Sequence, residues 1–397
     1  MTPISDTQSK SPPSAFEKRV KRRVTARVHD FFAVCPPGLK ATCAAELAAL
    51  DKDIQEIRVL SGGVAFRAKL PLACLANMVL GSPSKILMRI DSFKAENFPT
   101  LERKIRQIDW ELFLPGNTRL DIQVTAHKSR LYHSGAIEER CRSIIEPRLF
   151  TPGKKSEQSL FIRADNDQFE LSLDMSGDLL FKRGVKQKVI AAPLRENLAF
   201  AILKTAGFTR EDVLMDPMCG SGTFSIEAAM IQSNIPPGFF RSFAFEHWPG
   251  FRQENFNYLK NQLQQAFCLK GGPGIFASDM DDSALSLLRD AIGEHDFLKV
   301  IQTEKTDFFD IQPTQFTPKK GVVVLNPPYG KRLGKEMDMT RFFAEIGKKL
   351  AADFKGWRVG IIYPEKALGK AMGLPLQPMP FFHGGLDLFA GIGQIRG

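Results

Sequence analysis

The stretch LMDPMCGSGTFSIEAAM, residues 214–230, decides the fold. It begins as an apolar run that ends at Asp216, and it finishes with apolar side chains at helical spacing. Between these parts, two glycines permit a tight turn that brings the backbone close to a ligand. The free N–H groups at the start of a helix favour a carboxylate or a phosphate. We therefore predict a strand, a binding turn and a helix, with candidate ligand contacts at Asp216, Pro217, Gly220, Gly222 and Thr223.

Two common phosphate-binding patterns are missing from this turn. A dinucleotide fingerprint needs a third glycine at position 225, which is Ser225, and no Gly-Lys-Ser/Thr sequence follows to form a phosphate loop. These absences argue against dinucleotide and nucleoside triphosphate ligands. A strand-turn-helix connection without any ligand has the same local pattern, so the turn alone leaves a purely structural role open.

The rest of the carboxyl-terminal half alternates strand patterns with helix patterns. Apolar runs at 274–280, 322–328 and 357–364 alternate with helical spacing at 282–292 and 340–354. Alternation of this kind predicts an α/β fold with a doubly wound parallel sheet. In such sheets, ligands bind at the carboxyl ends of the strands. We assign residues 181–397 to this domain and expect the catalytic site at that edge.

Acidic residues follow two further predicted strands. Asp279 ends the run FASD, and Asp307 follows the next strand in KTDFFD. Asp279 is placed to accept hydrogen bonds from ribose hydroxyls, as acids do in other nucleoside-binding α/β sheets. Asp307 is placed to accept one from an adenine amino group, with Phe308 packing on the ring. Together with Asp216 and the glycine turn, these acids describe a site for an adenosine that carries an amino-acid group.

The sequence NPPY, Asn326 to Tyr329, follows the apolar run VVVL. An exocyclic base amine is a poor nucleophile because its lone pair is delocalised into the ring. The Asn326 side-chain oxygen and the Pro327 carbonyl can accept its hydrogens and favour the tetrahedral geometry of attack. Pro328 helps to fix the turn, and Tyr329 offers a face for the target base to stack on. The predicted chemistry is direct methyl transfer to nitrogen, although a plain turn between a strand and a helix also fits these four residues.

Together, DPMCGSGT, the strand-end acids and NPPYG resemble the class I S-adenosylmethionine-dependent methyltransferases, in the branch that methylates amino groups. The segment FKRGVKQKVIAAPLRENLAFAIL, residues 181–203, is similar to the one preceding the glycine motif in RNA guanine-N2 methyltransferases that carry a THUMP domain. Their Arg-Gly pair appears as Arg183 and Gly184, and their Pro-Leu-Arg-Glu helix begins at Pro193.

This resemblance implies a function as well as a fold. The cofactor is expected to be S-adenosylmethionine, which Asn326 also borders, and the substrate is expected to be a guanine in 23S ribosomal RNA or a large-subunit precursor. Two departures stand out: His383 occupies a position where relatives often have Asn before Gly, and the chain stops at Gly397, without the second methyltransferase domain of some relatives. The activity of that second domain is not carried over.

The amino-terminal half fits the same family. Residues 1–29 predict a basic, disordered arm, residues 30–90 a ferredoxin-like subdomain, and residues 91–180 a THUMP-like RNA-binding domain of α+β type. The stretch HKSRLYHSG mixes basic groups with an aromatic ring, which suits phosphate contact and base stacking in RNA. Its candidate RNA-binding residues are Lys128, Arg130, Tyr132 and His133, although a solvated loop at a strand end has a similar composition.

Composition bounds the remaining possibilities. The 397 residues carry a formal net charge of +10, which fits a polyanionic partner. The six cysteines form no Cys-x-x-Cys pair, so we predict neither a metal site nor a disulfide framework, and we interpret Cys219 in the glycine turn as a packing residue. No apolar run approaches the roughly 18 residues of a membrane span, and the amino terminus lacks the apolar core of a signal peptide. We expect a cytoplasmic protein without membrane contact.

Other substrates and one other class of protein remain open at this stage. An NPPY turn also suits adenine N6 in a nucleic acid, guanine N2 in transfer RNA, or a protein glutamine amide. A non-catalytic RNA-binding or ribosome-assembly factor with an inactive methyltransferase fold is the alternative from a different class. The intact NPPY and GSG sequences argue against that alternative, because a purely structural fold needs neither.

Overall fold

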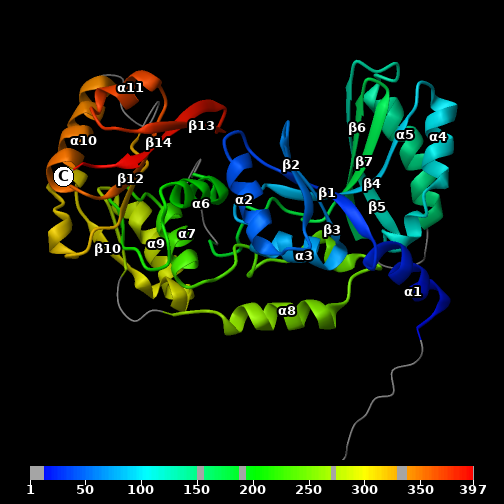
Figure 1. Cartoon of the computed structure of the whole chain (residues 1–397), viewed down its shortest axis with the longest axis horizontal. Helices are drawn as coiled ribbons and strands as arrows, with labels where there is room; N and C mark the ends of the chain where they lie inside the picture. Colours follow the sequence, from blue (N-terminus) through cyan, green and yellow to red (C-terminus); the bar gives the residue numbers. More distant parts are fainter. Residues whose placement is uncertain (1–12, 150–155, 187–193, 270–273, 329–337, 397) are drawn as a thin grey trace, which may run out of the picture.

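The structure is a computed structural model, and it describes residues 13–149, 156–186, 194–269, 274–328 and 338–396. Two seven-stranded sheets organise the described chain. Figure 1 shows them as two modules side by side along the long axis, with the amino-terminal sheet on the right and the carboxyl-terminal sheet on the left. No helix among the described residues is long and apolar enough to cross a membrane.

The amino-terminal sheet has the strand order β2-β3-β1-β4-β7-β6-β5. Its strands are β1 (Val28–Val34), β2 (Gln55–Leu60), β3 (Gly63–Lys69), β4 (Lys85–Lys94), β5 (Thr118–His127), β6 (Ser156–Asp165) and β7 (Gln168–Asp174). All neighbouring strands are antiparallel except β5 and β6. With α2 (Lys40–Leu50) and α3 (Leu70–Val79), the first four strands form the βαββαβ order of a ferredoxin-like unit.

The long strand β4 connects the two parts of this module. It pairs with β1 along one edge and with β7 along the other, so one continuous sheet crosses the expected boundary at residue 90. Two helices belong to the second part, α4 (Phe98–Gln107) and α5 (Ser134–Ile145). The division into residues 30–90 and 91–180, and the THUMP-like assignment of the second part, stay predictions.

The carboxyl-terminal sheet has the order β10-β9-β8-β11-β12-β14-β13. Its strands are β8 (Leu214–Asp216), β9 (Ile275–Asp279), β10 (Ile301–Lys305), β11 (Val322–Leu325), β12 (Arg358–Tyr363), β13 (Gln377–His383) and β14 (Leu386–Gln394). The first five in this order from β10 to β12 are parallel, and β14 runs antiparallel to both β12 and β13. Chain order reverses between β8 and β11, which makes that position the topological switch point where open α/β sheets bind ligands.

Helices cover both faces of this sheet. The helices α6 (Glu196–Thr205), α7 (Thr223–Gln232) and α9 (Asp282–Glu294) bury one face, and α10 (Met339–Asp353) and α11 (Lys366–Ala371) bury the other. Along β11, Val322 and Val324 point into the first core while Val323 and Leu325 point into the second. A strand buried on both faces needs an unbroken apolar run, and VVVL supplies it.

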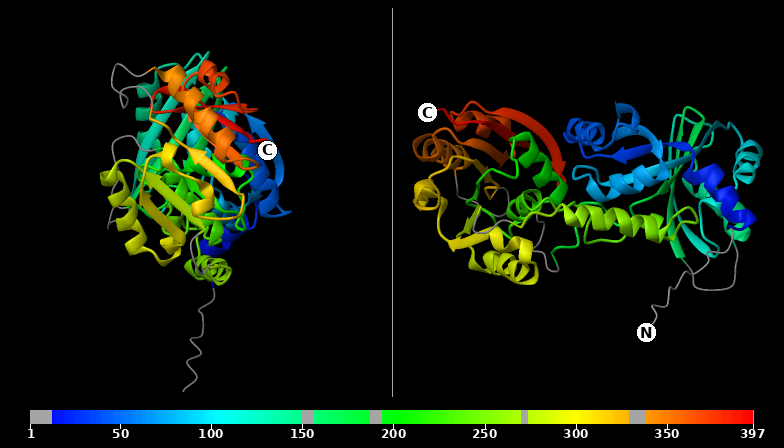
Figure 2. Two further views of the ribbon diagram at one scale, coloured as in Figure 1. Left: turned by 90° about the vertical axis from the view of Figure 1, so that its left-hand side faces the viewer. Right: turned by 60° about the horizontal axis from the view of Figure 1, so that its bottom comes forward.

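A long insertion between α7 and β9 joins the two modules. It contains α8 (Gln253–Gln265), which lies beneath the amino-terminal module, on the side nearer the carboxyl-terminal module, in Figure 1 and in the right-hand view of Figure 2. Phe243, Phe245 and Phe256 from this insertion are buried in the core of the amino-terminal module. The indole N–H of Trp248 donates to Gln158 Oε1 at 2.8 Å, across the same boundary. Side chains of the catalytic half therefore complete the other module's core.

A buried ion pair and the hydrogen bonds of its arginine form a second connection between the modules. Arg183 donates two hydrogen bonds to the Glu227 carboxylate, at 3.0 and 3.2 Å, and both side chains are at most 2% exposed. The same guanidinium donates to the carbonyl of Leu180 and, at 2.7 Å, to that of Gly81 in the amino-terminal module. Burial raises the pKa of Glu227, and the charge of Arg183 opposes that rise. One arginine thus ties α7, the connecting segment and the amino-terminal module together.

The basic segment near the amino terminus differs from the expected arm. It is helical from Ala15, with α1 (Ala15–Val20) followed by a π-helical turn (Lys21–Thr25). Val20 and Val24 are each 1% exposed and belong to the core of the amino-terminal module. Sequence reasoning weighed the charges and overlooked these two valines, which are four residues apart and therefore share one helix face.

Breaking the ion pair between Arg183 and Glu227 should destabilise the protein strongly. Removing one partner leaves a buried charge without its counterion, so we expect Glu227→Gln to lower the free energy of unfolding by about 3–5 kcal/mol. The double substitution Arg183→Met/Glu227→Met should cost less than the sum of the two single methionine variants. Urea denaturation of the unaltered protein, the two single methionine variants and the double variant measures this coupling. Arg252→Gln, which breaks an exposed pair with Glu17, is the control and should cost at most about 1 kcal/mol; additive single effects would contradict the coupling.

Candidate functional site

The glycine turn joins β8 to α7 at the switch point of the sheet. Gly222 has a φ of 74°, and a Cβ atom placed there would lie 2.5 Å from Leu288 Cδ1 on α9. This glycine is required for close packing between the turn and a helix. Gly220 also has a positive φ of 52°, but a Cβ atom there would meet nothing within 4 Å. Gly220 therefore borders open space at the ligand edge, where the backbone is approachable.

Asp216 ends β8 and is completely buried. Its Oδ2 accepts a hydrogen bond of 2.7 Å from the Ser225 hydroxyl on α7, while its Oδ1 accepts none from any described residue. Burial raises the pKa of Asp216 to about 7, and the nearby charge of Asp279 adds to the rise. An acceptor atom without a partner in a buried position fits a site that is completed by a ligand with hydrogen-bond donors.

Asp279 closes over the turn from the end of β9. Its Oδ2 accepts a 2.8 Å hydrogen bond from the Gly220 N–H, and its Oδ1 accepts one of 3.0 Å from the Asp281 N–H. The side chain is half-buried, and each carboxylate oxygen has a second lone pair. The structure therefore places this acid beside the turn with capacity left for hydroxyl donors.

After the end of β10, Asp307 remains partly accessible whereas Phe308 is buried in the core. Asp307 is half-buried, and its Oδ1 accepts a 3.0 Å hydrogen bond from the Phe309 N–H at the start of a short 3-10 helix (Phe308–Asp310). Phe308 is 1% exposed and packs with Phe354 in the core beneath α10, at 6.2 Å between ring centroids. That burial leaves Phe308 no free ring face for adenine, so its contribution is to hold the strand end from below.

Asn326 follows β11 directly, beside β8 in the sheet. The atom Asn326 Oδ1 is buried and accepts no hydrogen bond from any described residue. Pro327 is buried and Pro328 is half-buried. Tyr329 lies outside the described residues. The structure thus brings an unused amide oxygen to the same edge as the glycine turn.

Lys186 is a polar residue of this region that sequence reasoning missed. Its ammonium group donates a 2.8 Å hydrogen bond to Thr223 Oγ1, at the first residue of α7. Burial lowers the pKa of Lys186, while the carboxylates of Glu196, Glu227 and Asp216 oppose that effect. The signal was available in the sequence RGVK, where a lysine comes three residues after Arg183.

Comparison with known proteins decides the family. Residues 183–379 match the family described as RMKL-like, methyltransferase domain, and residues 30–87 match the RlmL ferredoxin-like domain. The "Putative RNA methyltransferase slr0064" of Synechocystis sp. is 32% identical over 372 residues, which make up 91% of this chain and 96% of that relative. The chain belongs to the RMKL-like methyltransferase family.

Two further comparisons bear on this methyltransferase. The Ribosomal RNA large subunit methyltransferase K/L of Syntrophotalea carbinolica is 31% identical over 361 residues, 87% of this chain but 50% of the relative, so the chain spans about half the length of such relatives. The crystal structure of SMU.472, "a putative methyltransferase complexed with SAH", has a TM-score of 0.83 at 27% identity and covers 94% of this chain and 98% of that one. The predicted class I fold, ferredoxin-like opening and S-adenosylmethionine cofactor are confirmed.

The residues at the switch point fit that cofactor. An open backbone at Gly220, an acid beside it at Asp279 and a helix start at Thr223 correspond to the places where a nucleoside and an amino-acid group need partners. The residue roles within this site stay proposals.

Metal and thiol chemistry gain no support within the described chain. No group of three or more His, Cys, Asp or Glu side chains there could hold a metal ion. Cys219 is 9% exposed, and burial raises the pKa of its thiol well above the ordinary value. A protonated, buried thiol is a poor nucleophile, which agrees with a packing role in the turn.

The candidate RNA-binding loop after β5 is exposed at all four predicted positions, Lys128, Arg130, Tyr132 and His133. Tyr132 and His133 lie ring against ring at 4.7 Å between centroids, and Arg130 pairs with Glu96. The helix α5, which follows directly, lies at the opposite end of the molecule from α10 and α11 (Figure 1). The structure therefore keeps this loop apart from the methyltransferase site.

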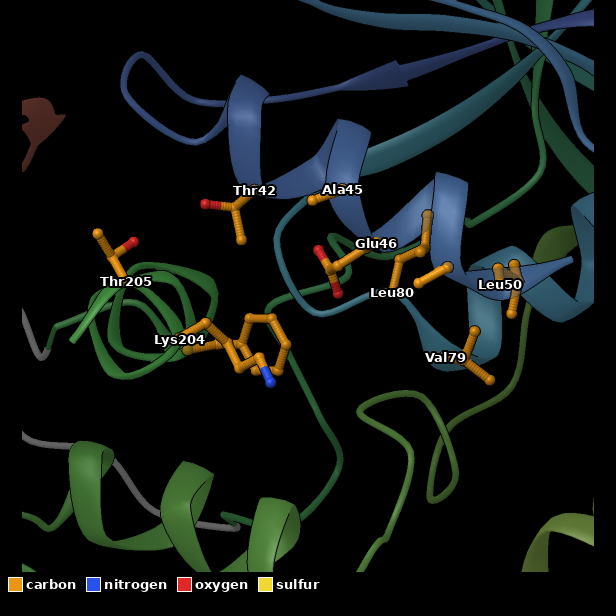
Figure 3. Close-up of a pocket in the computed structure, with 10 residues that line it drawn as sticks. Thr42, Ala45, Glu46, Leu50, Val79, Leu80, Lys204 and Thr205 are labelled. Carbon is orange, nitrogen blue, oxygen red and sulfur yellow. The ribbon is translucent and has the colours of Figure 1, made fainter. Parts of the chain in front are cut away.

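A cavity of about 550 Å³ lies between the two modules, away from the strand ends. Figure 3 shows Glu46 of α2 pointing into it opposite Lys204 of α6. The Glu46 carboxylate already accepts hydrogen bonds from the N–H groups of Gly81 and Ser82, at 2.6 and 3.1 Å. None of the predicted site residues lines this cavity, so it belongs to the junction and not to the methyltransferase site.

The raised pKa of Asp216 predicts a pH dependence of stability. The folded state keeps the proton up to about pH 7, whereas the unfolded state releases it near 3.8, so the free energy of unfolding falls as pH rises between these values. Asp216→Asn removes this titration, and the variant should be more stable than the unaltered protein at pH 8 by up to about 4 kcal/mol, but not at pH 4. Urea denaturation without cofactor at both pH values tests this.

Other buried acids do not confuse that comparison. Glu46 and Glu227 also have raised pKa values, but both proteins contain them, so the difference between the two pH profiles isolates position 216. An equal stability difference at both pH values would contradict the assignment of the titration to Asp216.

Proposed function

We propose that this methyltransferase transfers a methyl group to the N2 amine of a guanine in large-subunit ribosomal RNA. The observation that carries the proposal is the buried Asn326 Oδ1, which accepts no hydrogen bond from any described residue and lies at the cofactor edge of the sheet. A buried amide oxygen without a partner is costly, and an exocyclic amine would supply the missing donor.

The proposed chemistry needs little more than orientation. When bound, S-adenosylmethionine supplies an electrophilic methyl group on a sulfonium sulfur. Methylation of the guanine N2 amine would leave S-adenosylhomocysteine and release one proton from the nitrogen. Asn326 Oδ1 and the Pro327 carbonyl accept the amine hydrogens and aim the nitrogen lone pair, so the chain acts mainly through positioning. Base flipping brings the guanine to this edge.

RNA is the favoured substrate for two reasons. Relatives across most of this chain are named as RNA or ribosomal RNA methyltransferases. The formal net charge of +10 also suits a polyanion, and the exposed loop after β5 offers cations and the tilted ring pair of Tyr132 and His133. Action on ribosomal RNA also fits a cytoplasmic location, which we propose on the same grounds.

The direct test uses isotopically labelled S-adenosylmethionine with unmodified ribosomal RNA, transfer RNA and DNA in separate reactions. After digestion, mass spectrometry should find the label in N2-methylguanosine from ribosomal RNA. Label in methyladenine or in transfer RNA would replace the proposed substrate while keeping the amine chemistry. No label in any nucleic acid, despite measurable S-adenosylhomocysteine binding, would overturn the proposal in favour of a protein amide or a non-catalytic factor.

Removing the amide acceptor should separate catalysis from cofactor binding. We expect Asn326→Ala to lower the single-turnover methylation rate by about 10²–10³-fold, the usual size for loss of one precisely placed polar group. The affinity for S-adenosylhomocysteine, measured by calorimetry, should change by less than about threefold. Asn326→Gln keeps the amide but displaces it by one methylene and should also be slow. Loss of cofactor affinity in a folded Asn326→Ala protein would contradict this division of roles.

Lys186 provides a separate test of the cofactor's orientation. Its ammonium lies at the start of α7, where it would hold the carboxylate of the cofactor's amino-acid part. Lys186→Met should weaken S-adenosylhomocysteine binding by about 10–100-fold. It should leave 5′-methylthioadenosine, which lacks the amino-acid part, unaffected. Lys182→Met, at an exposed pair with Asp178, is the control. Equal losses for both ligands would show that Lys186 acts only on the structure of the turn.

A further inference from the structure

In the helical segment of residues 15–25, some basic residues pair with acidic residues and others face away from the core. Val20 and Val24 face the core, as described above, and fix the rotation of the helix. Arg19 forms an ion pair with Glu111, and Arg23 forms one with Asp109, in the segment that precedes β5. These four residues anchor the segment and leave its opposite side to the remaining cations.

The outward side carries charges without acidic partners among the described residues. Lys18, Lys21 and Arg22 are spaced three and four residues apart, so they share one helix face, and all three are exposed. Arg27, just beyond the helical segment, is also exposed. None of these four makes an ion pair with a described acidic residue. We name them the basic face: Lys18, Lys21, Arg22 and Arg27.

The basic face is an addition to what the family models cover. Those models match residues 30–87 and 183–379, so the helical segment lies before the first matched residue. It is also remote from the methyltransferase site. In Figure 1 and in the right-hand view of Figure 2, α1 lies at the end of the molecule away from α10 and α11.

We propose that the basic face is a second RNA-binding surface, which holds the phosphate backbone of the substrate at a distance from the methylated base. The inference rests on the proposed RNA substrate. Phosphate contacts require cations but no sequence-specific geometry, and they position a nucleic acid without reading it. Docking by Val20 and Val24 fixes the helical segment that carries Lys18, Lys21 and Arg22, and Arg27 directly precedes β1, so RNA binding does not have to order this segment first.

The experiment measures binding of a fluorescein-labelled RNA stem-loop to the full chain from about 50 to about 200 mM KCl. Replacing the basic face by Lys18→Gln, Lys21→Gln, Arg22→Gln and Arg27→Gln should reduce the magnitude of the slope of log affinity against log salt by about 3, since each phosphate contact contributes roughly 0.7–0.9. At about 50 mM salt, affinity should fall by at least about tenfold.

A matched control removes the same charge elsewhere. The control replaces four exposed lysines of the catalytic half by Gln: Lys319, Lys320, Lys348 and Lys355. Lys348 lies on α10, and the other three precede β11 or β12, at the sheet edge opposite the ligand edge. These replacements should leave the slope unchanged. Neither set of substitutions should alter S-adenosylhomocysteine affinity, which calorimetry checks as evidence of folding.

Each outcome decides between the two proposals. Loss of slope in the basic-face variant alone supports the second surface. An unchanged slope in that variant, while the unaltered protein binds RNA, overturns this inference and leaves the proposed function intact. Absence of salt-dependent RNA binding in the unaltered protein overturns both. Tighter binding of the unaltered protein to anionic phospholipid vesicles than to the stem-loop, lost in the basic-face variant, assigns the face to a membrane surface and overturns the RNA inference.

Discussion

The buried ion pair between Arg183 and Glu227 is the constraint on which the arrangement of the methyltransferase depends. Two opposite charges excluded from water must stay paired, and Arg183 additionally satisfies two backbone carbonyls, one of them in the other module. Glu227 belongs to α7, the helix that begins at the glycine turn. The position of that turn is therefore linked to the position of the amino-terminal module through one side chain.

The same region concentrates titratable groups around the start of α7. Lys186 is close enough to Asp216 and to Glu227 to lower the pKa of both acids, and burial disfavours the charged form of all three groups. Without a ligand, the turn thus holds an acid whose pKa is near 7 and an acceptor atom without a described donor. A cationic ligand that also carries hydrogen-bond donors would favour the ionised acid and complete its hydrogen bonding. This is the physical reason why we propose the turn as a binding site and not merely a connection.

Much of the catalytic half could be predicted from sequence because its signals are local. The apolar run VVVL, the glycines at 220 and 222 and the acid at 279 each have one structural consequence at one place, and the strand order brings those places together. Phe308 shows the limit: its position after a strand was correct, but only packing against Phe354 determines that its ring is buried. The junction was beyond sequence reasoning because Phe243, Trp248 and Gln158 meet only in the folded chain. Val20 and Val24 were overlooked for a related reason, since the surrounding charges dominated the composition of their segment.

The junction also determines how substrate recognition and chemistry are related. Because insertion side chains such as Phe245 and Phe256 complete the core of the amino-terminal module, the two modules cannot separate without exposing apolar surface. Cations on one module are therefore held at a fixed separation from Asn326 on the other. An RNA that contacts both must have a shape whose backbone and target base match this separation. Under the proposed function, recognition would come from the geometry of a folded RNA, and the strand edge would need to recognise only an exocyclic amine.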